Sequence, residues 1–283
     1  MKSNQTYAIT LVEYAYGPAF SNAMVYSGYY EMTGTTAVEY VIGVIEGPSG
    51  ILLVDCGYDP QHEVAGRESR AQNHIKYQHP TKVLKKAGFN PEDVSGILLT
   101  HLHWDHADCL ECFPNAKIYV QKDELFGWIE TLSMPKEYNT LKVSVDICDI
   151  KECINALGED RLVLLDGSVE DLFPGIDITV APNGHSWAGS LITVNTKDGK
   201  YTFTGDTAYV KDNILGGRHD GVSMPNGYNC GSVKNVLITM QDILRLAQGD
   251  MNKVLISHDI GVWDCFESIT TPEDDLRIAY VAK

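Results

Sequence analysis

The sequence predicts a layered α/β protein, in which β-sheets are covered by outer helices. Short apolar runs rich in β-formers recur along the chain, and helical regions alternate with them, so that a strand-rich part, a helical part, a second strand-rich part and a second helical part follow one another. A chain of 283 residues can bury a core without disulfide bonds. We therefore expect one domain over residues 1–283, with strands at 38–46, 51–54, 97–100, 117–120, 162–165, 176–180, 191–195, 201–204 and 254–257.

The first two of these strands form a predicted hairpin. Residues 38–46 are rich in β-branched and aromatic side chains, and residues 51–54 form a short apolar run. The segment Gly47-Pro48-Ser49-Gly50 between them consists of turn-forming residues. An antiparallel strand pair is therefore expected near the start of the chain.

Three regions are predicted to be helical. One helix begins at Pro80 and ends near Gly88, residues 122–160 are mostly helical, and apolar side chains recur at helical spacing over 233–247. Residues 125–160 are expected to form a lid or insertion that covers a pocket. The segment Tyr14–Tyr30, rich in tyrosine and glycine, is interpreted as a loop that lies near the site or packs on the body of the protein.

Composition excludes several kinds of partner. The net charge of −16 repels phosphate backbones, so nucleic acid is not an expected partner. No apolar stretch reaches the roughly 18–20 residues of a membrane helix, and the N-terminal residues are polar, so we expect a cytoplasmic protein without a membrane partner. A homodimer is compatible with the sequence.

The cysteines indicate a reducing environment. Their number is seven, which favours free thiols over a disulfide framework. Cys109 and Cys112 form a Cys-x-x-Cys pair three residues after His106. Packing is one interpretation of this pair, and a redox or additional metal contact is the other.

One short segment has the side chains of a metal site. The apolar run 97–100 leads into His101-Leu102-His103-Trp104-Asp105-His106. Imidazole and carboxylate groups are ligands for zinc, iron or manganese. In an extended segment His101 and His103 point to the same side, while Asp105 and His106 can turn toward a second position. This one loop can therefore serve two metal ions.

This segment and four later or earlier motifs resemble those of the metallo-β-lactamase superfamily. The pattern His-x-His-x-Asp-His is followed by Gly184-His185-Ser186, by Gly205-Asp206 and by Ser257-His258, and it is preceded by Asp55-Cys56-Gly57. The resemblance covers residues 38–260 and implies an αββα sandwich of two mixed β-sheets with outer helices. It also implies two divalent metal ions, with zinc expected first and iron or manganese as alternatives.

The resemblance assigns a role to each residue. One ion would be held by His101, His103 and His185, the other by Asp105, His106 and His258, and Asp206 would bridge them. Asp55 would orient a ligand histidine, although capping of the turn beside Gly57 explains it equally well.

The expected reaction is the opening of a cyclic ester. Metal-dependent hydrolases use a bridging hydroxide as the nucleophile, and Asp105 would act as general acid–base. Gly205-Asp206-Thr207-Ala208-Tyr209 is similar to the N-acyl homoserine lactonase branch, in which a tyrosine at the position of Tyr209 stabilises the oxyanion. Packing is the other interpretation of Tyr209. The small-molecule substrate would be a lactone, and the alternative is a cyclic amide, a cyclic ketone or a thioester.

The remaining histidines are interpreted as solvated side chains. They are His62, His74 and His79, which lie in a polar stretch, and His219, which lies in a glycine-rich loop. The alternative for His74 or His79 is contact with a substrate, if the polar stretch folds over the site.

Overall fold

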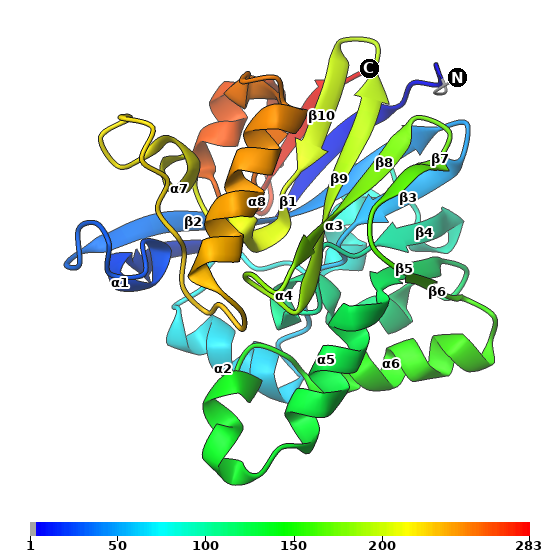
Figure 1. Ribbon diagram of the computed structural model, residues 1–283. Helices are drawn as coiled ribbons and strands as arrows, with labels where there is room; N and C mark the ends of the chain where they lie inside the picture. The colour runs from blue at the N-terminus through cyan, green and yellow to red at the C-terminus, as the bar shows by residue number, and fades with distance from the viewer. Residues whose placement is uncertain (1–3) are drawn as a thin grey trace.

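Two β-sheets packed face to face form the centre of the computed structural model, which describes residues 4–283 (Figure 1). The strands of the larger sheet lie in the order β12 (Glu267–Thr270), β13 (Arg277–Ala282), β1 (Ala8–Ser21), β2 (Thr35–Gly47), β3 (Gly50–Val54), β4 (Val94–Leu98), β5 (Lys117–Gln121) and β6 (Leu162–Leu165). Those of the smaller sheet lie in the order β11 (Val254–Leu255), β10 (Gly199–Phe203), β9 (Ala188–Thr196), β8 (Ile176–Pro182) and β7 (Val169–Phe173). Both sheets are mixed, because β3 to β6 and the β10–β11 pair are parallel and the other pairs are antiparallel.

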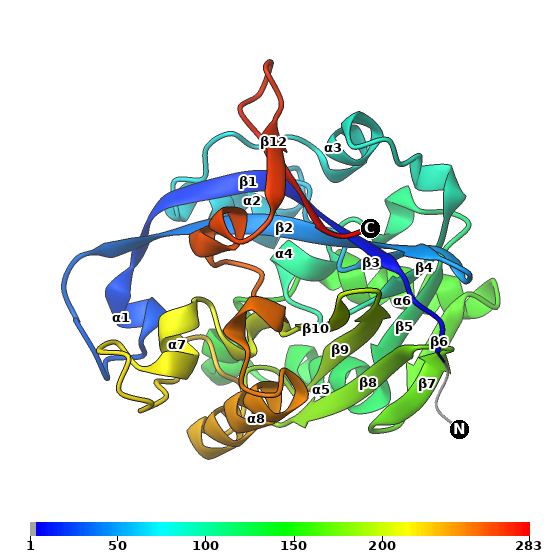
Figure 2. The ribbon, with the colours of Figure 1, turned by 90° about the horizontal axis from the view of Figure 1, so that it is seen from above.

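Helices cover the outer face of each sheet. The larger sheet is covered by α2 (Glu63–Ala71), α3 (Pro80–Lys86), α5 (Lys122–Ser133) and α6 (Ile147–Gly158), and the smaller sheet by α8 (Val233–Leu246). Figure 2 shows the resulting order of layers, from α3 through the two sheets to α8. The predicted αββα fold class is therefore confirmed. Short helical segments complete the chain: α1 (Asn22–Val25), α4 (Trp104–Ala107), α7 (Lys211–Leu215), η1 (Pro91–Asp93), η2 (Leu110–Cys112), η3 (Lys136–Lys142), η4 (Gly205–Thr207), η5 (Met251–Lys253) and η6 (Ile260–Asp264).

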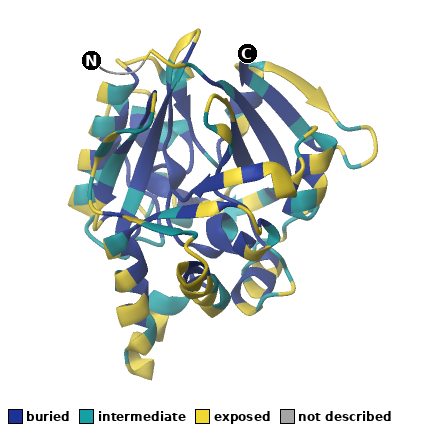
Figure 3. Cartoon of the chain, turned by 90° about the vertical axis from the view of Figure 1, so that its right-hand side faces the viewer, coloured by how far each residue is buried: buried dark blue, intermediate teal, exposed yellow. Residues whose placement is uncertain are grey.

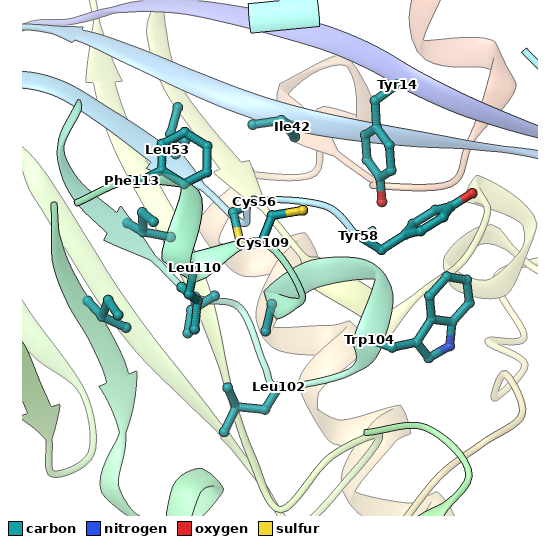
Figure 4. Packing of buried hydrophobic residues seen from close by; sticks show 14 of the residues in the cluster. Tyr14, Ile42, Leu53, Cys56, Tyr58, Leu102, Trp104, Cys109, Leu110 and Phe113 are labelled. Atoms are coloured by element: carbon teal, nitrogen blue, oxygen red, sulfur yellow. The ribbon is translucent and has the colours of Figure 1, made fainter. Parts of the chain in front are cut away.

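Apolar side chains fill the spaces between the layers. Leu52 and Leu98 of the larger sheet meet Ile178 and Val194 of the smaller one, and all four are buried. A second cluster lies between the larger sheet and its helices, and part of it is seen in Figure 4. Figure 3 shows buried strands at the centre and exposed outer faces on the helices. Burial of this apolar area is the main stabilising contribution to the fold.

The structure corrects the prediction for the segment Tyr14–Tyr30. Instead of a loop, β1 runs to Ser21 and pairs with β2 along its length, and α1 follows. The tyrosine- and glycine-rich composition suggested a loop, but the register shifts between Gly17 and Phe20, and such an irregularity accommodates Pro18 within a strand. The terminal strands β12 and β13 and the strand β7 were also not predicted.

None of the helices within residues 4–283 combines the length and the apolar composition that a membrane-spanning helix requires.

Candidate metal centre

The predicted metal ligands come together at the ends of strands from both sheets. His101 and His103 follow β4, His185 follows β8, Asp206 lies in η4 directly after β10, and His258 follows β11. Asp105 and His106 lie in the short helix α4. Chain segments far apart in sequence thus meet where several strands end, which is a common place for a site in layered α/β proteins.

These seven side chains form two groups that share one aspartate. The first contains His101, His103, His185 and Asp206, and the second contains Asp105, His106, Asp206 and His258. Within each group the candidate ligand atoms lie within 4.8 Å of one another.

The two oxygens of Asp206 face different groups. Its Oδ2 lies 3.8 Å from His101 Nε2 and 3.5 Å from His185 Nε2. Its Oδ1 lies 3.1 Å from the Nε2 atoms of His106 and of His258. A carboxylate placed in this way can contact one cation with each oxygen.

The donor atoms fit metal ions better than they fit one another. Within residues 4–283, His101 Nε2, His106 Nε2 and Asp206 Oδ1 are buried and have no hydrogen-bond partner. Leaving such atoms unsatisfied costs about 1–3 kcal/mol each, and a bound cation would remove that cost. Burial lowers the pKa of His101 and His103 well below the usual value, and the neighbouring charge of His106 for His101 and of His185 for His103 acts in the same direction. Both rings are then neutral at pH 7, which is the form that binds metals.

The far sides of the rings are held by hydrogen bonds. Asp55 Oδ2 lies 2.7 Å from His106 Nδ1, and Asp55 also accepts hydrogen bonds of 2.8 Å from the backbone N–H and the hydroxyl of Thr100. His258 Nδ1 donates to the backbone carbonyl of Glu39 at 2.6 Å. When Nδ1 carries the proton, Nε2 is left free to face the centre. The structure thus places Asp55 beside His106, in a turn where its own φ is +61°.

A glycine next to Asp206 is required by close packing. Gly205 has φ of +49°, and a Cβ atom there would lie 2.6 Å from the Cβ of Thr100. A larger residue would push η4 away from the loop that carries His101. This explains why glycine precedes the shared aspartate.

One residue that supports the centre could not be recognised from the sequence. Glu124 of α5 is fully buried, and its Oε1 accepts hydrogen bonds from Leu102 N at 2.9 Å, from Trp128 Nε1 at 2.8 Å and from the Ser186 hydroxyl. Its Oε2 accepts from Ala188 N at 2.8 Å. Leu102 lies between two candidate ligands and Ser186 follows a third, so Glu124 connects two histidine loops. In sequence it is an ordinary acidic residue in the first turn of a helix.

A cavity opens onto the second metal group. Asp105, Asp206 and His258 line it together with Trp104 and Tyr209. The rest of its wall includes Phe20, Val38, Tyr40, Glu68, Gln72, His103, Val143, Ser144 and Tyr228. Two of these, Val143 and Ser144, belong to the 125–160 segment, which therefore contributes to the wall.

Tyr209 stands between the two metal groups. Its ring lies edge-on to His185 and His258, with centroid distances of 5.7 and 5.6 Å. Its hydroxyl donates to the Gly227 carbonyl at 3.2 Å. The side chain is buried from solvent and also borders the cavity.

The other histidines differ from one another. The prediction that His74 is solvated is wrong. Its ring packs on the ring of Tyr40, with the two centroids 4.2 Å apart, and a 2.9 Å hydrogen bond joins its Nδ1 to the Tyr58 hydroxyl. His219 is 66% exposed, as predicted. His62 and His79 are partly exposed, and His62 pairs with Asp108 at 2.9 Å.

Comparison with known proteins places these features in a family. The profile of the Metallo-beta-lactamase superfamily matches residues 36–264. An N-acyl homoserine lactonase of Bacillus cereus is 30% identical over 132 residues, which are 47% of this chain and 46% of that protein. The N-acyl homoserine lactonase AiiB of Agrobacterium fabrum is 24% identical over 184 residues, or 62% of this chain and 60% of that protein. The matched regions thus span about half the length of these curated relatives.

Solved structures share the fold. A mutant of the B. thuringiensis protein AiiA with bound N-decanoyl-L-homoserine has a TM-score of 0.67 at 20% identity, over 94% of this chain and 98% of that one. The dizinc quorum-quenching lactonase AidC has a TM-score of 0.64 at 16% identity, over 100% of this chain and 99% of that one. The superfamily profile covers most of the chain and includes the candidate ligands in its range, so this protein belongs to the metallo-β-lactamase superfamily.

Proposed function

We propose that this protein is a dinuclear metal-dependent hydrolase that opens lactone rings, with N-acyl homoserine lactones as its substrate class. The observation that carries the proposal is the pair of ligand groups sharing Asp206 beside a cavity lined by Tyr209. The similarity to lactonases of Bacillus and Agrobacterium supports the choice of bond. A cyclic amide, a cyclic ketone or a thioester has no comparable support.

Two divalent ions, zinc in the first instance, would be held by the seven candidate ligands. When bound, such ions lower the pKa of water and polarise a substrate carbonyl. His101, His103 and His185 would hold one ion and Asp105, His106 and His258 the other, with one oxygen of Asp206 for each.

Asp105 is proposed to move the proton. Its carboxylate borders the cavity, and its Oδ2 lies 3.4 Å from His258 Nε2. Burial raises its pKa above the usual value, against the lowering effect of the His106 charge. From its position beside the cavity the carboxylate can take the proton of the attacking water and deliver it to the ring oxygen that leaves.

Tyr209 is proposed to stabilise the oxyanion. Burial, with the neighbouring charge of Asp206, raises its pKa well above the usual value, so the hydroxyl keeps its proton throughout the pH range of the assay. A protonated phenol can donate a hydrogen bond to a substrate oxygen but cannot act as a base. Donation to the Gly227 carbonyl at 3.2 Å holds the hydroxyl until a substrate oxygen competes for it.

The apolar surface in and beside the cavity supports an acylated lactone as the substrate. Phe20, Val38 and Val143 give the cavity an apolar wall. An adjoining hollow shares Val143, Ser144 and Tyr228 with it and continues past Met24 and Leu141. An apolar acyl chain can lie along this surface while the ring occupies the metal side.

The test is hydrolysis by protein of known metal content. Purified protein is given a panel of acyl homoserine lactones, simple lactones, cyclic amides and thioesters, with His106→Ala as the inactive control. Turnover of lactones and thioesters is followed by proton release, and turnover of amides by chromatographic detection of the ring-opened product. The proposal predicts lactone turnover that increases as the two sites of the centre are filled with metal. Turnover of only an amide or a thioester would contradict the substrate class, and metal-loaded protein without turnover of any of them would contradict the hydrolase.

A further inference from the structure

A second cluster of metal-binding side chains lies outside the centre described above. His79 occupies the position before α3, Cys109 directly precedes the turn η2, and Cys112 is the last residue of that turn. The Nε2 atom of His79 and the two sulfur atoms lie within 4.8 Å of one another. Cys109 is buried beside Cys56 (Figure 4), whereas Cys112 and His79 are partly exposed. An ion could therefore enter from the side of Cys112.

We propose that Cys109, Cys112, His79 and Asp59 form a third metal site, which binds a zinc-class ion as a structural clamp. Two thiolates, an imidazole and a carboxylate are a donor set that zinc accepts in tetrahedral geometry. The site contains no residue of the proposed dinuclear centre, and it does not depend on the proposed function.

The distances are close to those of a tetrahedral ion. Cys112 Sγ lies 4.0 Å from His79 Nε2. A zinc ion with its sulfur at 2.3 Å and its nitrogen at about 2.1 Å holds those two atoms roughly 3.6 Å apart. Asp59 Oδ2 lies 3.9 Å from the same Nε2 and is the proposed fourth donor, but it lies outside the group of three residues whose ligand atoms are all within 4.8 Å of one another. The Asp59 side chain would have to move toward the sulfur atoms to reach ligand distance.

The ring of His79 has a partner that can fix the required tautomer. In the structure Nδ1 accepts a hydrogen bond of 3.3 Å from the Thr81 backbone N–H and lies 2.9 Å from the Thr81 hydroxyl. Binding of an ion at Nε2 would place the ring proton on Nδ1, which would then donate to the Thr81 hydroxyl oxygen in place of accepting from the backbone N–H.

The two thiols differ in their pKa. The neighbouring Cys109 thiol and His79 lower the pKa of Cys112 to about 5, although burial opposes them, so Cys112 is a thiolate at pH 7. Burial raises the pKa of Cys109 well above its usual value, so this thiol would lose its proton to solvent when the cation binds.

The position of the site explains what an ion would do there. Asp59 follows β3, His79 begins α3, and the cysteines follow α4, which carries Asp105 and His106. The backbone already links these segments, because Cys56 N donates to the His106 carbonyl at 2.8 Å and Asp108 N to the Gly57 carbonyl at 3.0 Å. An ion would clamp them together directly behind the second ligand group.

Cobalt provides a test that reports this site alone. The full-length protein is produced in cobalt-supplemented medium, and its near-ultraviolet spectrum is recorded. A thiolate-to-cobalt charge-transfer band is expected, and the proposed dinuclear centre cannot produce one because it contains no cysteine. Cys112→Ser should lose most of the band and one metal ion per chain, whereas Cys265→Ser, which changes an exposed thiol elsewhere, should retain both.

Two further measurements leave all four proposed metal-binding side chains in place. Thr81→Val, which removes the acceptor for His79 Nδ1–H, should weaken cobalt binding at this site by roughly 10–100-fold. In the unmodified protein, bound zinc should slow maleimide labelling of Cys112 relative to protein treated with a chelator.

Several results would overturn the proposal. They are a wild-type spectrum without the band, a band that Cys112→Ser leaves intact, and a thiol count that falls from the seven cysteines by two because Cys109 and Cys112 form a disulfide. Lactone turnover separates the two proposals. Turnover without the band would refute only the third site, and the band without turnover would refute only the hydrolase.

Discussion

Replacement of Glu124 by glutamine tests whether the metal centre depends on a residue that touches none of its ligands. The buried carboxylate accepts hydrogen bonds from Leu102 N, Trp128 Nε1, the Ser186 hydroxyl and Ala188 N. Glutamine keeps the size of the side chain but offers only one acceptor oxygen and replaces the other with an N–H donor. At least one of the four donors would then face another donor.

The expected loss of stability follows from that mismatch of donors. One buried donor without a partner costs about 1–3 kcal/mol. At roughly 2–4 °C per kcal/mol for a chain of this size class, the Tm should fall by about 2–12 °C. Because Glu124 positions the loops of His101, His103 and His185, metal affinity should also fall, by roughly 10–100-fold.

The assay is a thermal melt combined with a chelator competition for bound zinc. The matched control is Glu130→Gln, which makes the same chemical change at an exposed position of the same helix and should alter neither quantity. If Glu124→Gln left both the Tm and the metal affinity at their wild-type values, the argument that this carboxylate holds the two histidine loops would be refuted.

Three other changes have expected outcomes. Asp55→Asn should weaken metal binding by roughly 10–100-fold, because a weaker acceptor faces His106 Nδ1, and wild-type affinity in the chelator competition would contradict the orienting role. Tyr209→Phe should lower kcat by about 10²–10³-fold with the metal content unchanged, and an unchanged kcat would remove Tyr209 from the mechanism. His74→Gln should make the free energy of unfolding less sensitive to acid. Burial, with the His258 charge, lowers the pKa of His74 to about 3. Between about pH 6.5 and 3 the unfolded chain therefore binds a proton at His74 that the folded chain does not, so the stability of the wild type falls as the pH falls. Urea titrations should show that the variant loses less stability between pH 7 and 5 than the wild type, by up to about 2 kcal/mol, and an equal loss would contradict this account.

Most of the fold could be predicted from local patterns. Apolar runs such as 162–165 and 176–180 became β6 and β8, and the helix predicted over 233–247 became α8. The long strand β1 could not be recognised, because its pairing with β2 depends on contacts between distant residues and its Gly-Pro segment resembles a loop. The helix α2 lies in a stretch so polar that its few buried side chains give little signal.

The candidate site could also be predicted only in part. Residues whose chemistry is unusual, such as the three histidines within 101–106, can be found from sequence, because their types and spacing are rare without a metal. Glu124 and His79 could not be assigned, because their significance lies in burial and in neighbours that the fold supplies. The role of an ordinary residue becomes visible only when its hydrogen-bond partners are known.

The central claim, that two metal ions share Asp206, is tested most directly by a crystal structure of the zinc-loaded protein with anomalous diffraction recorded at the zinc edge. The account predicts two anomalous peaks a few ångströms apart, one beside His101, His103 and His185 and the other beside Asp105, His106 and His258, with one oxygen of Asp206 directed at each. A single peak at this centre, or no zinc beside Asp206, would contradict it.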